Sequence, residues 1–147
     1  MRVCAQPEGA GAPGGLRRWG RTGWGSAHAV EVPPNATLLF TAGIVGTRED
    51  GSLPDSSAEQ CERVFENLRL VLQEAGLGWD DCVKMMMYFT DGCDPGNDLQ
   101  PARARAVGEG WTGCAATALG VRGIVGAPGA VVQVELIAAK CEPAAAL

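Results

Sequence analysis

The side chains that could do chemistry gather in residues 113–140, GCAATALGVRGIVGAPGAVVQVELIAAK. Glu135 follows Gln133 by two positions in a mostly apolar run, so both side chains point to the same face of a predicted strand. A carboxylate there can orient a water molecule or move a proton, and it can equally serve a contact between subunits. The amide of Gln133 can hydrogen-bond a substrate amide or carbonyl, so we expect it to bind rather than to catalyse.

Three further side chains are candidates for the same site. Thr117 offers a hydroxyl that either faces a substrate or satisfies its strand edge. His28 is the only histidine, the side-chain type that changes its charge near neutral pH. Cys114 would need a lowered pKa and a neighbouring base to act as a nucleophile. No such base is evident in the sequence, so a structural role is favoured for Cys114.

The cysteines do not form a metal-binding pattern. There are six, widely and irregularly spaced, without a C-x-x-C pair and with only one histidine in the chain. Structural zinc sites need closely spaced cysteine and histidine pairs, so we expect no structural zinc site. In a cytoplasmic chain with a real core, such cysteines are reduced and mostly act as small buried apolar residues.

Length and composition predict one soluble globular domain. The chain has 147 residues, of which 46% are hydrophobic and 20% charged, with a net charge of −5. This acidic balance argues against nucleic acid or an anionic membrane surface as the main partner. No apolar run approaches the ~18 residues that a membrane span needs, and the N-terminus lacks the apolar region of a secretory signal. We therefore expect a cytoplasmic protein.

The elements that must position these residues follow from the apolar pattern. A helix is predicted over 57–76, with Ser56 and Glu59 as a capping box and Gly76 as its stop. The other predicted elements are strands at 27–32, 37–45, 82–90, 114–122 and 130–139, and a second helix at 97–111. The order β-β-α-β-α-β-β predicts an α+β layer with both helices on one face of one sheet. The other face then needs a cover, which a second copy of the chain can supply.

Three segments follow from this pattern. Residues 1–25 are rich in Gly, Pro and Arg without periodicity, which predicts a flexible or loosely packed lead-in. Trp19 and Trp24 are the residues in it that can dock on the domain. The domain itself is expected at 26–141, followed by a short tail at 142–147. On the second helix, Arg103 and Arg105 are expected to form a solvated face.

Three pieces of the chain occur in an order that is hard to produce by chance. They are LLFTAGIVGTREDGSLP, EQCERVFENLRLVLQEAGLGWDDCVKMMMYFTD and VVQVELIAA. Over about residues 26–140 the chain thus resembles the RidA (YjgF-type) family of reactive-intermediate deaminases. The resemblance implies a chorismate-mutase-like α+β fold and a homotrimer with three clefts between subunits. It also implies hydrolysis of enamines and imines to keto acids and ammonia, without a metal or cofactor.

The chain departs from that family at its chemical positions. The family anchors the substrate carboxylate with the arginine of a Pro-Ala-Arg-Ser/Thr motif, which reads Cys-Ala-Ala-Thr here and puts Ala116 at the arginine position. The family's water partner is the first glutamate of a Glu-Ile-Glu motif, and Gln133 stands at that position. Alanine cannot bind a carboxylate and a glutamine cannot act as a base.

Other pocket positions differ as well. The family's serine-glycine-glutamine turn is Ala42-Gly43-Ile44 here, its usual early tyrosine falls at Ser26, and its usual asparagine falls at about Leu99. Together these changes predict a pocket that is more apolar and less able to bind acids.

We expect a RidA-like enzyme that deaminates an imine, an enamine or a related labile intermediate in a remodelled cleft between subunits. A less acidic substrate, such as a biosynthetic intermediate, would fit. The expected catalytic residues are Glu135, Thr117 and His28, and the expected substrate-binding residues are Gly43, Cys114, Ala116, Ala118, Gln133 and Ile137. The alternative is a non-catalytic trimer that binds a small apolar ligand or a protein partner. The expected partners are thus a small molecule and further copies of the chain.

Overall fold

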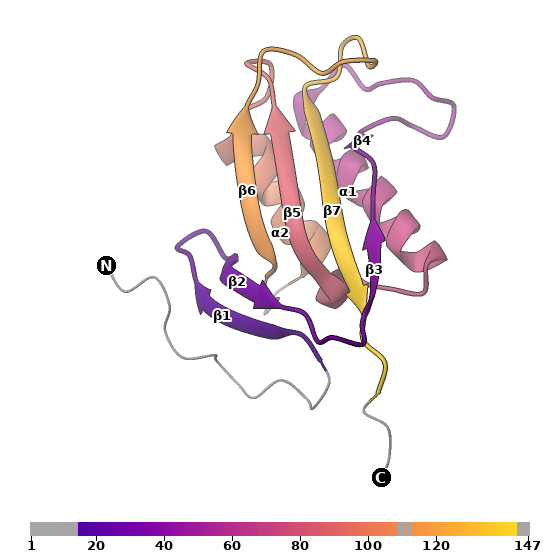
Figure 1. Cartoon of the computed structure of the whole chain (residues 1–147). Coiled ribbons are helices and arrows are strands. Elements are labelled where there is room, and N and C mark those ends of the chain that lie inside the picture. The colour runs from indigo at the N-terminus through magenta and orange to yellow at the C-terminus, as the bar shows by residue number, and fades with distance from the viewer. Residues whose placement is uncertain (1–14, 109–110, 112, 144–147) are drawn as a thin grey trace.

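The computed structural model describes residues 15–108, 111 and 113–143. Within them, strands form one mixed sheet in the order β1-β2-β6-β5-β7-β3, and β4 pairs with β7 beyond the end of β3. Helices α1 (Ser57–Glu74) and α2 (Gln100–Val107) lie on one face of this sheet, and the described residues leave the opposite face largely uncovered (Figure 1). The predicted α+β layer with both helices on one face is confirmed. We call the uncovered side the open face.

The central strands set which residues share a face. β6 runs parallel to both β2 and β5, whereas β7 runs antiparallel to β5, β3 and β4. The strand bounds are β1 Arg17–Arg21, β2 Ala27–Glu31, β3 Thr37–Phe40, β4 Ile44–Val45, β5 Cys82–Phe89, β6 Ala115–Gly120 and β7 Val132–Lys140. A short helix, η1 (Trp79–Asp81), precedes β5, and a wide helical turn, η2 (Pro95–Leu99), leads into α2. No helix of the described residues is long and apolar enough to cross a bilayer.

Strand β1 is an element that the sequence did not predict. It lies in the segment expected to be a loose lead-in, of which residues 1–14 lie outside the described residues. Arg18 fixes β1 to the domain: its Nε donates to the Gly113 carbonyl at 2.8 Å and its Nη2 to the Asp80 carbonyl at 2.6 Å. The strand is thus held by its antiparallel pairing with β2 and by long-range contacts of one arginine, and no local periodicity reveals those contacts.

The predicted strand 37–45 is divided in two. β3 ends at Phe40 and β4 begins at Ile44, and Thr41 stands between them. The Thr41 backbone N–H donates to the Leu136 carbonyl, and its hydroxyl accepts from the Leu136 N–H, both at 3.0 Å. The Thr41 hydroxyl thus replaces a backbone carbonyl as the acceptor of one hydrogen bond between the strands. The backbone leaves the regular strand path at this point, and Gly43 comes to lie beside β7.

Helix α1 begins and ends as its sequence predicts. The Ser56 hydroxyl accepts a hydrogen bond from the Glu59 N–H at 3.3 Å. At the other end Gly76 has φ +72°, and the N–H groups of Gly76 and Leu77 donate back to Gln73 and Leu72. This is the hydrogen-bond pattern of a glycine-terminated helix.

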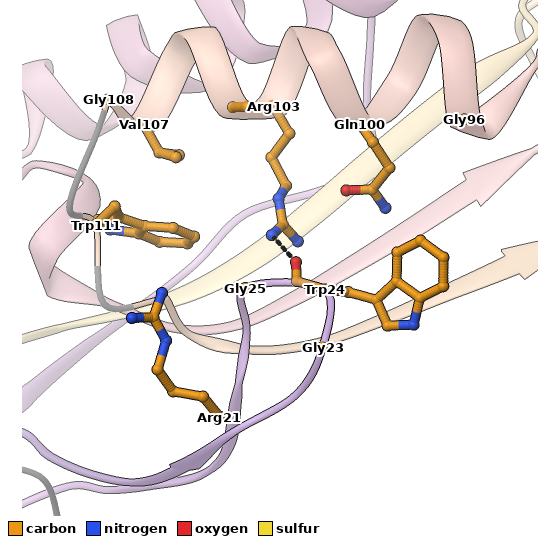
Figure 2. A pocket seen from close by; sticks show the side chains of 11 residues that line it. Arg21, Gly23, Trp24, Gly25, Gly96, Gln100, Arg103, Val107, Gly108 and Trp111 are labelled. Atoms are coloured by element: carbon orange, nitrogen blue, oxygen red, sulfur yellow. Dashed lines mark hydrogen bonds between the residues drawn. The ribbon is translucent and has the colours of Figure 1, made fainter.

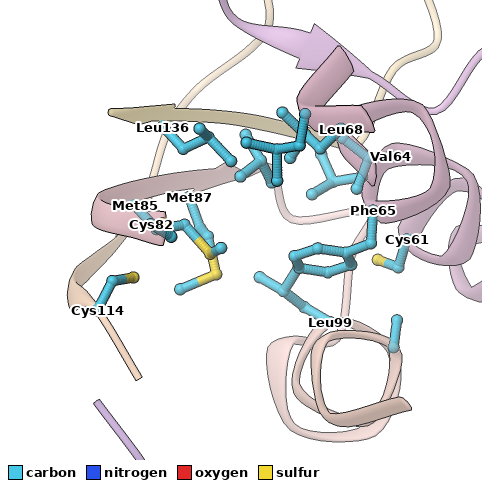
Figure 3. Packing of buried hydrophobic residues seen from close by; sticks show 14 of the residues in the cluster. Cys61, Val64, Phe65, Leu68, Cys82, Met85, Met87, Leu99, Cys114 and Leu136 are labelled. Carbon is cyan, nitrogen blue, oxygen red and sulfur yellow. The ribbon is translucent and has the colours of Figure 1, made fainter. Parts of the chain in front are cut away.

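The core lies between α1, α2 and the covered face of the sheet. Figure 3 shows Phe65, Val64 and Leu68 of α1 packing toward Met85 and Met87 of β5 and Leu136 of β7. Alternation along β5 and β7 therefore fixes the opposite set, residues 84, 86 and 88 with residues 133, 135 and 137, on the open face.

Two amides of α1 fasten the loops that carry the strand ends. Gln60 is 2% exposed, and its Nε2 donates to the carbonyls of Pro54 and Gly129 at 2.8 and 3.1 Å. Its Oε1 accepts from the Val131 N–H at 3.0 Å, immediately before β7. Asn67 donates to the carbonyls of Val45 and Thr47, both at 3.0 Å. Both amides thus position β4 and the start of β7.

Replacing Gln60 with leucine should destabilise the fold. The substitution leaves two carbonyls and one N–H without their partner, which costs about 2–3 kcal/mol of unfolding free energy when such groups are buried. Urea unfolding followed by circular dichroism measures the change, with Gln73→Leu as the control because Gln73 lies exposed on the same helix. Equal stability of the two variants would show that the Gln60 bonds are not needed.

Candidate functional site

The structure divides the predicted site residues between the two faces of the sheet. Met86 of β5 lies on the open face, and it pairs with Thr117 of β6 on one side and with Glu135 of β7 on the other. The open face therefore carries Thr117, Glu135 and, by alternation along β7, Gln133 and Ile137. Ala116 and Ala118 lie on the helix-covered face with Met85 and Met87, as does the buried Cys114. One copy of the chain therefore does not bring all of these residues into one pocket.

The open face carries two hydrogen-bonded polar pairs on adjacent strands. The Tyr88 hydroxyl donates to Glu135 Oε1 at 3.1 Å, and Lys84 Nζ donates to the Thr117 hydroxyl at 2.9 Å. A cavity of about 220 Å³ lies here, lined by Lys84, Glu135, Ile137, Met86 and Phe40 among others. The site thus places a carboxylate and an ammonium group around one small apolar hollow.

Gly43 and Gln133 touch directly beside this hollow. A Cβ built on Gly43 would lie 2.5 Å from the Gln133 side-chain carbon, so the amide packs against the Gly43 backbone and would have to shift for any larger residue. The backbone of Gln133 pairs with Val45 and Tyr88. Gln133 can therefore present its amide beside the Gly43 backbone.

The covered face has a second cavity, between β6 and α2, which we call the α2–β6 cavity. It has a volume of about 390 Å³. Ala116 and Ala118 of β6 form one wall, and Ser26 lies at its edge with Met87 and Phe89. The small β6 side chains leave this space open. Leu99, expected at a pocket position, is instead fully buried in the core.

Arg103 lies in the wall of the α2–β6 cavity, and the expectation of a solvated arginine there is wrong. Arg103 is only 6% exposed, because the turn that carries Trp24 covers α2. Its Nη2 donates to the Trp24 carbonyl at 2.8 Å, and its guanidinium carbon lies 5.9 Å from the centre of the Trp111 ring (Figure 2). Burial lowers the pKa of Arg103 from its usual value, although the charged form of arginine persists at neutral pH. Arg105 is exposed and pairs with Glu62, as expected.

Cys114 is fully buried, so substrate does not reach it in this arrangement. Hydrogen bonding to Cys114 and burial raise the pKa of the Cys82 thiol. The same bond lowers the pKa of Cys114, and the charge of Arg103 acts in the same direction. The five described cysteines are free thiols and four of them are buried.

His28 stands apart from both cavities. It lies on β2, where its Nδ1 packs against Gly20 of β1 without a hydrogen-bond partner among the described residues. Among the described residues, no three side chains of the metal-ligating types cluster.

Comparisons with known proteins agree with this fold. Residues 26–140 match the family described as Endoribonuclease L-PSP. The chain belongs to this family. The RidA (YjgF-type) resemblance and the chorismate-mutase-like fold are thereby confirmed.

Individual relatives support the same assignment. A Rid-family protein of Yersinia pestis, YyfB, superposes with a TM-score of 0.67 at 27% identity, covering 81% of this chain and 88% of that one. The RutC family protein YjgH of Escherichia coli is 39% identical over 54 residues, which are 37% of this chain and 41% of the relative. A RutC family protein of Aquifex aeolicus is 39% identical over 66 residues, 44% of this chain and 50% of the relative. The chain thus spans half or less of these two curated relatives.

Sequence reasoning missed two residues of the open face, and it named Trp24 as able to dock on the domain without placing it at a cavity. Tyr88 and Lys84 lie within an apolar strand and gave no motif signal, although strand alternation places them on the face of Glu135. Trp24, whose side chain is 78% exposed, lines the α2–β6 cavity from the turn after β1. Only the tertiary fold places it there.

The titration of Tyr88 can be used to detect the charge of Glu135, because Tyr88 is the only tyrosine of the chain and its signal is not mixed with others. Burial, then its hydrogen bond to Glu135 and the charge of that carboxylate, raise the pKa of the phenol above its usual value. The neutral phenol is favoured in the folded state, so this contribution to stability is complete below pH about 10 and lost as the pH rises through the folded pKa.

Glu135→Gln should therefore lower the pKa of Tyr88, since the negative charge is gone while the burial remains. Ultraviolet absorbance titration of the phenol measures it, with Glu49→Gln on the exposed loop as the control. An unchanged titration in Glu135→Gln would contradict the hydrogen bond.

Proposed function

We propose that the chain forms a homotrimer that hydrolyses an imine or enamine in clefts between its subunits. The observation that carries the proposal is the Glu135 carboxylate, held by Tyr88 at 3.1 Å on a sheet face that one copy leaves uncovered. A partner's open face placed at the α2–β6 cavity would reunite the two halves of the site. The cleft is remodelled, because alanine and glutamine stand at the family's arginine and glutamate positions.

The chemistry requires one oriented water. Glu135 accepts a proton from the water as its oxygen attacks the imine carbon and passes that proton to the nitrogen, which gives a carbinolamine. Glu135 then takes the proton of the carbinolamine hydroxyl and passes it to the nitrogen, so that the C–N bond breaks, the carbonyl forms and ammonia leaves. Lys84 fixes the Thr117 hydroxyl at 2.9 Å, so this pair can donate to the intermediate. Gln133 is proposed to bind the substrate. His28 stays a catalytic prediction on β2, and no cofactor is required by these steps.

RNA is a weaker candidate substrate, although the family description names an endoribonuclease. The chain carries a net charge of −5 at pH 7. Binding to RNA depends strongly on cations that neutralise phosphates, so an acidic chain is disfavoured as a nuclease.

A non-catalytic trimer that binds a small apolar ligand is the second candidate. Ala116 and Ala118 favour it, because they leave an apolar wall where the family carries an arginine. The activity measurement below separates this candidate from the enzyme.

The open face should be an interface between copies. Phe40 is 66% exposed there, and Leu38 and Leu119 are exposed on the same face. Light scattering should give three times the mass of the chain, and Phe40→Glu should dissociate the assembly because it buries a charge. The control is Leu70→Glu, at an exposed position on α1. A monomeric natural chain would contradict the cleft.

The natural chain should accelerate imine hydrolysis. An amino-acid oxidase generates the imines and semicarbazide traps those that escape, so a fall in semicarbazone measures the activity. Removing a general base costs about 100-fold or more, which we expect for Glu135→Gln but not for the exposed Glu74→Gln. If the natural chain is inert while Ala116→Arg with Gln133→Glu is active, the scaffold is sound but its chemistry is lost, which contradicts the enzyme and favours the second candidate.

A further inference from the structure

The α2–β6 cavity contains a buried cation that the function above does not use. Arg103 is 6% exposed, and among the described residues no carboxylate lies within ion-pairing distance of it. Removing a guanidinium from water without a counter-charge is costly. A buried arginine at a cavity wall therefore marks a place where an anion is stabilised.

The guanidinium is held in place and still has donors to offer. Its Nη2 donates to the Trp24 carbonyl at 2.8 Å, and its carbon lies 5.9 Å from the Trp111 ring centre. Figure 2 shows an adjoining pocket that shares Arg103, Gln100 and Trp24 with the α2–β6 cavity. In this view Arg103 descends from α2 between Trp111 and Trp24, with Gln100 beside it. A guanidinium has five N–H donors, and its planar fork matches the two oxygens of a carboxylate.

The wall of the cavity that β5 and β6 form is apolar. Met87, Phe89, Ala116 and Ala118 lie opposite Arg103, in a volume of about 390 Å³ that suits a small organic molecule. Ala116 is the position where the family carries its arginine. Arg103 of the helix and Ala116 of the strand thus line the same cavity, and the arginine of the helix is the cation available there.

Trp24 adds an aromatic surface at the mouth of the cavity. The turn that carries it is fixed by Thr22, whose hydroxyl lies 2.8 Å from that of Ser26 and accepts from the N–H groups of Trp24 and Ser26 at 3.3 Å. Its indole is 78% exposed although it lines the cavity. An exposed indole carried by this turn offers a stacking surface to a planar apolar group.

We propose that the α2–β6 cavity binds an organic acid with an apolar or aromatic side group, and that Arg103 anchors its carboxylate while Trp24 covers the side group. The proposal rests on the proposed function, since it names the substrate class of that cleft. It replaces the expectation of a less acid-binding pocket with a different position for the anchor.

Calorimetric titration with two probes of equal shape tests the proposal. Phenylacetate carries the carboxylate, whereas phenylacetamide lacks the charge. We expect phenylacetate to bind the natural chain at least tenfold more tightly than phenylacetamide does, because only the carboxylate pairs its charge with the guanidinium of Arg103. Equal affinity for both probes, or binding of neither, would overturn the proposal.

Arg103→Gln should weaken phenylacetate binding at least tenfold and leave phenylacetamide binding unchanged. Arg105→Gln is the matched control, because Arg105 lies on the same helix but is exposed and pairs with Glu62. Unchanged phenylacetate affinity in a folded Arg103→Gln variant would overturn the assignment. If that variant does not fold, Ala118→Leu tests the site instead, because it fills the cavity from an exposed strand position. We expect it to weaken the binding of both phenylacetate and phenylacetamide. Unaltered binding of both would show that the site lies elsewhere.

The calorimetry requires no turnover, so the two proposals fail separately. A chain that binds phenylacetate through Arg103 but hydrolyses no imine contradicts the proposed function alone. A chain that hydrolyses imines with the same KM in Arg103→Gln contradicts the Arg103 assignment alone.

Discussion

The buried amide of Gln60 is the contact on which the geometry of the site depends. It joins helix α1 to the loop before the helix and to the segment that leads into β7. Gly46 lies so close to the Gln60 carbonyl that no Cβ would fit there, so the chain after β4 is held against the same helix turn. β7 carries Gln133 and Glu135, so this one side chain fastens the start of the strand on which both lie.

A sheet covered on one side imposes the second constraint. Strand alternation sends successive residues to opposite faces, so neighbours in sequence such as Ala116 and Thr117 serve different cavities. The polar groups of the open face and the α2–β6 cavity lie on opposite sides of the same sheet. They can therefore contact one bound molecule only if they belong to different copies of the chain. Under the two proposals, catalysis requires assembly, and Arg103 and Glu135 would take the roles of the family's arginine and glutamate.

The sequence predicted the fold well, because periodic apolar residues and caps are local signals. Ser56, Gly76 and the apolar face of α1 needed no tertiary information. β1 escaped prediction because Arg18 stabilises it through carbonyls that are distant in sequence. Arg103 was misjudged for the same reason: helix periodicity cannot show that a turn 79 residues earlier covers it. Glu135 and Gln133 were placed on one face correctly, whereas their separation from Ala116 required the strand pairing.

A crystal structure of the assembled protein grown with phenylacetate tests the central claim most directly. The account predicts three copies whose open faces are covered, with the carboxylate on the Arg103 guanidinium and the ring between Trp24 and the wall formed by Ala116 and Ala118. It also predicts Glu135 of a neighbouring copy facing the bound acid. Acid bound away from Arg103, or copies that leave the open face in solvent, would contradict the account.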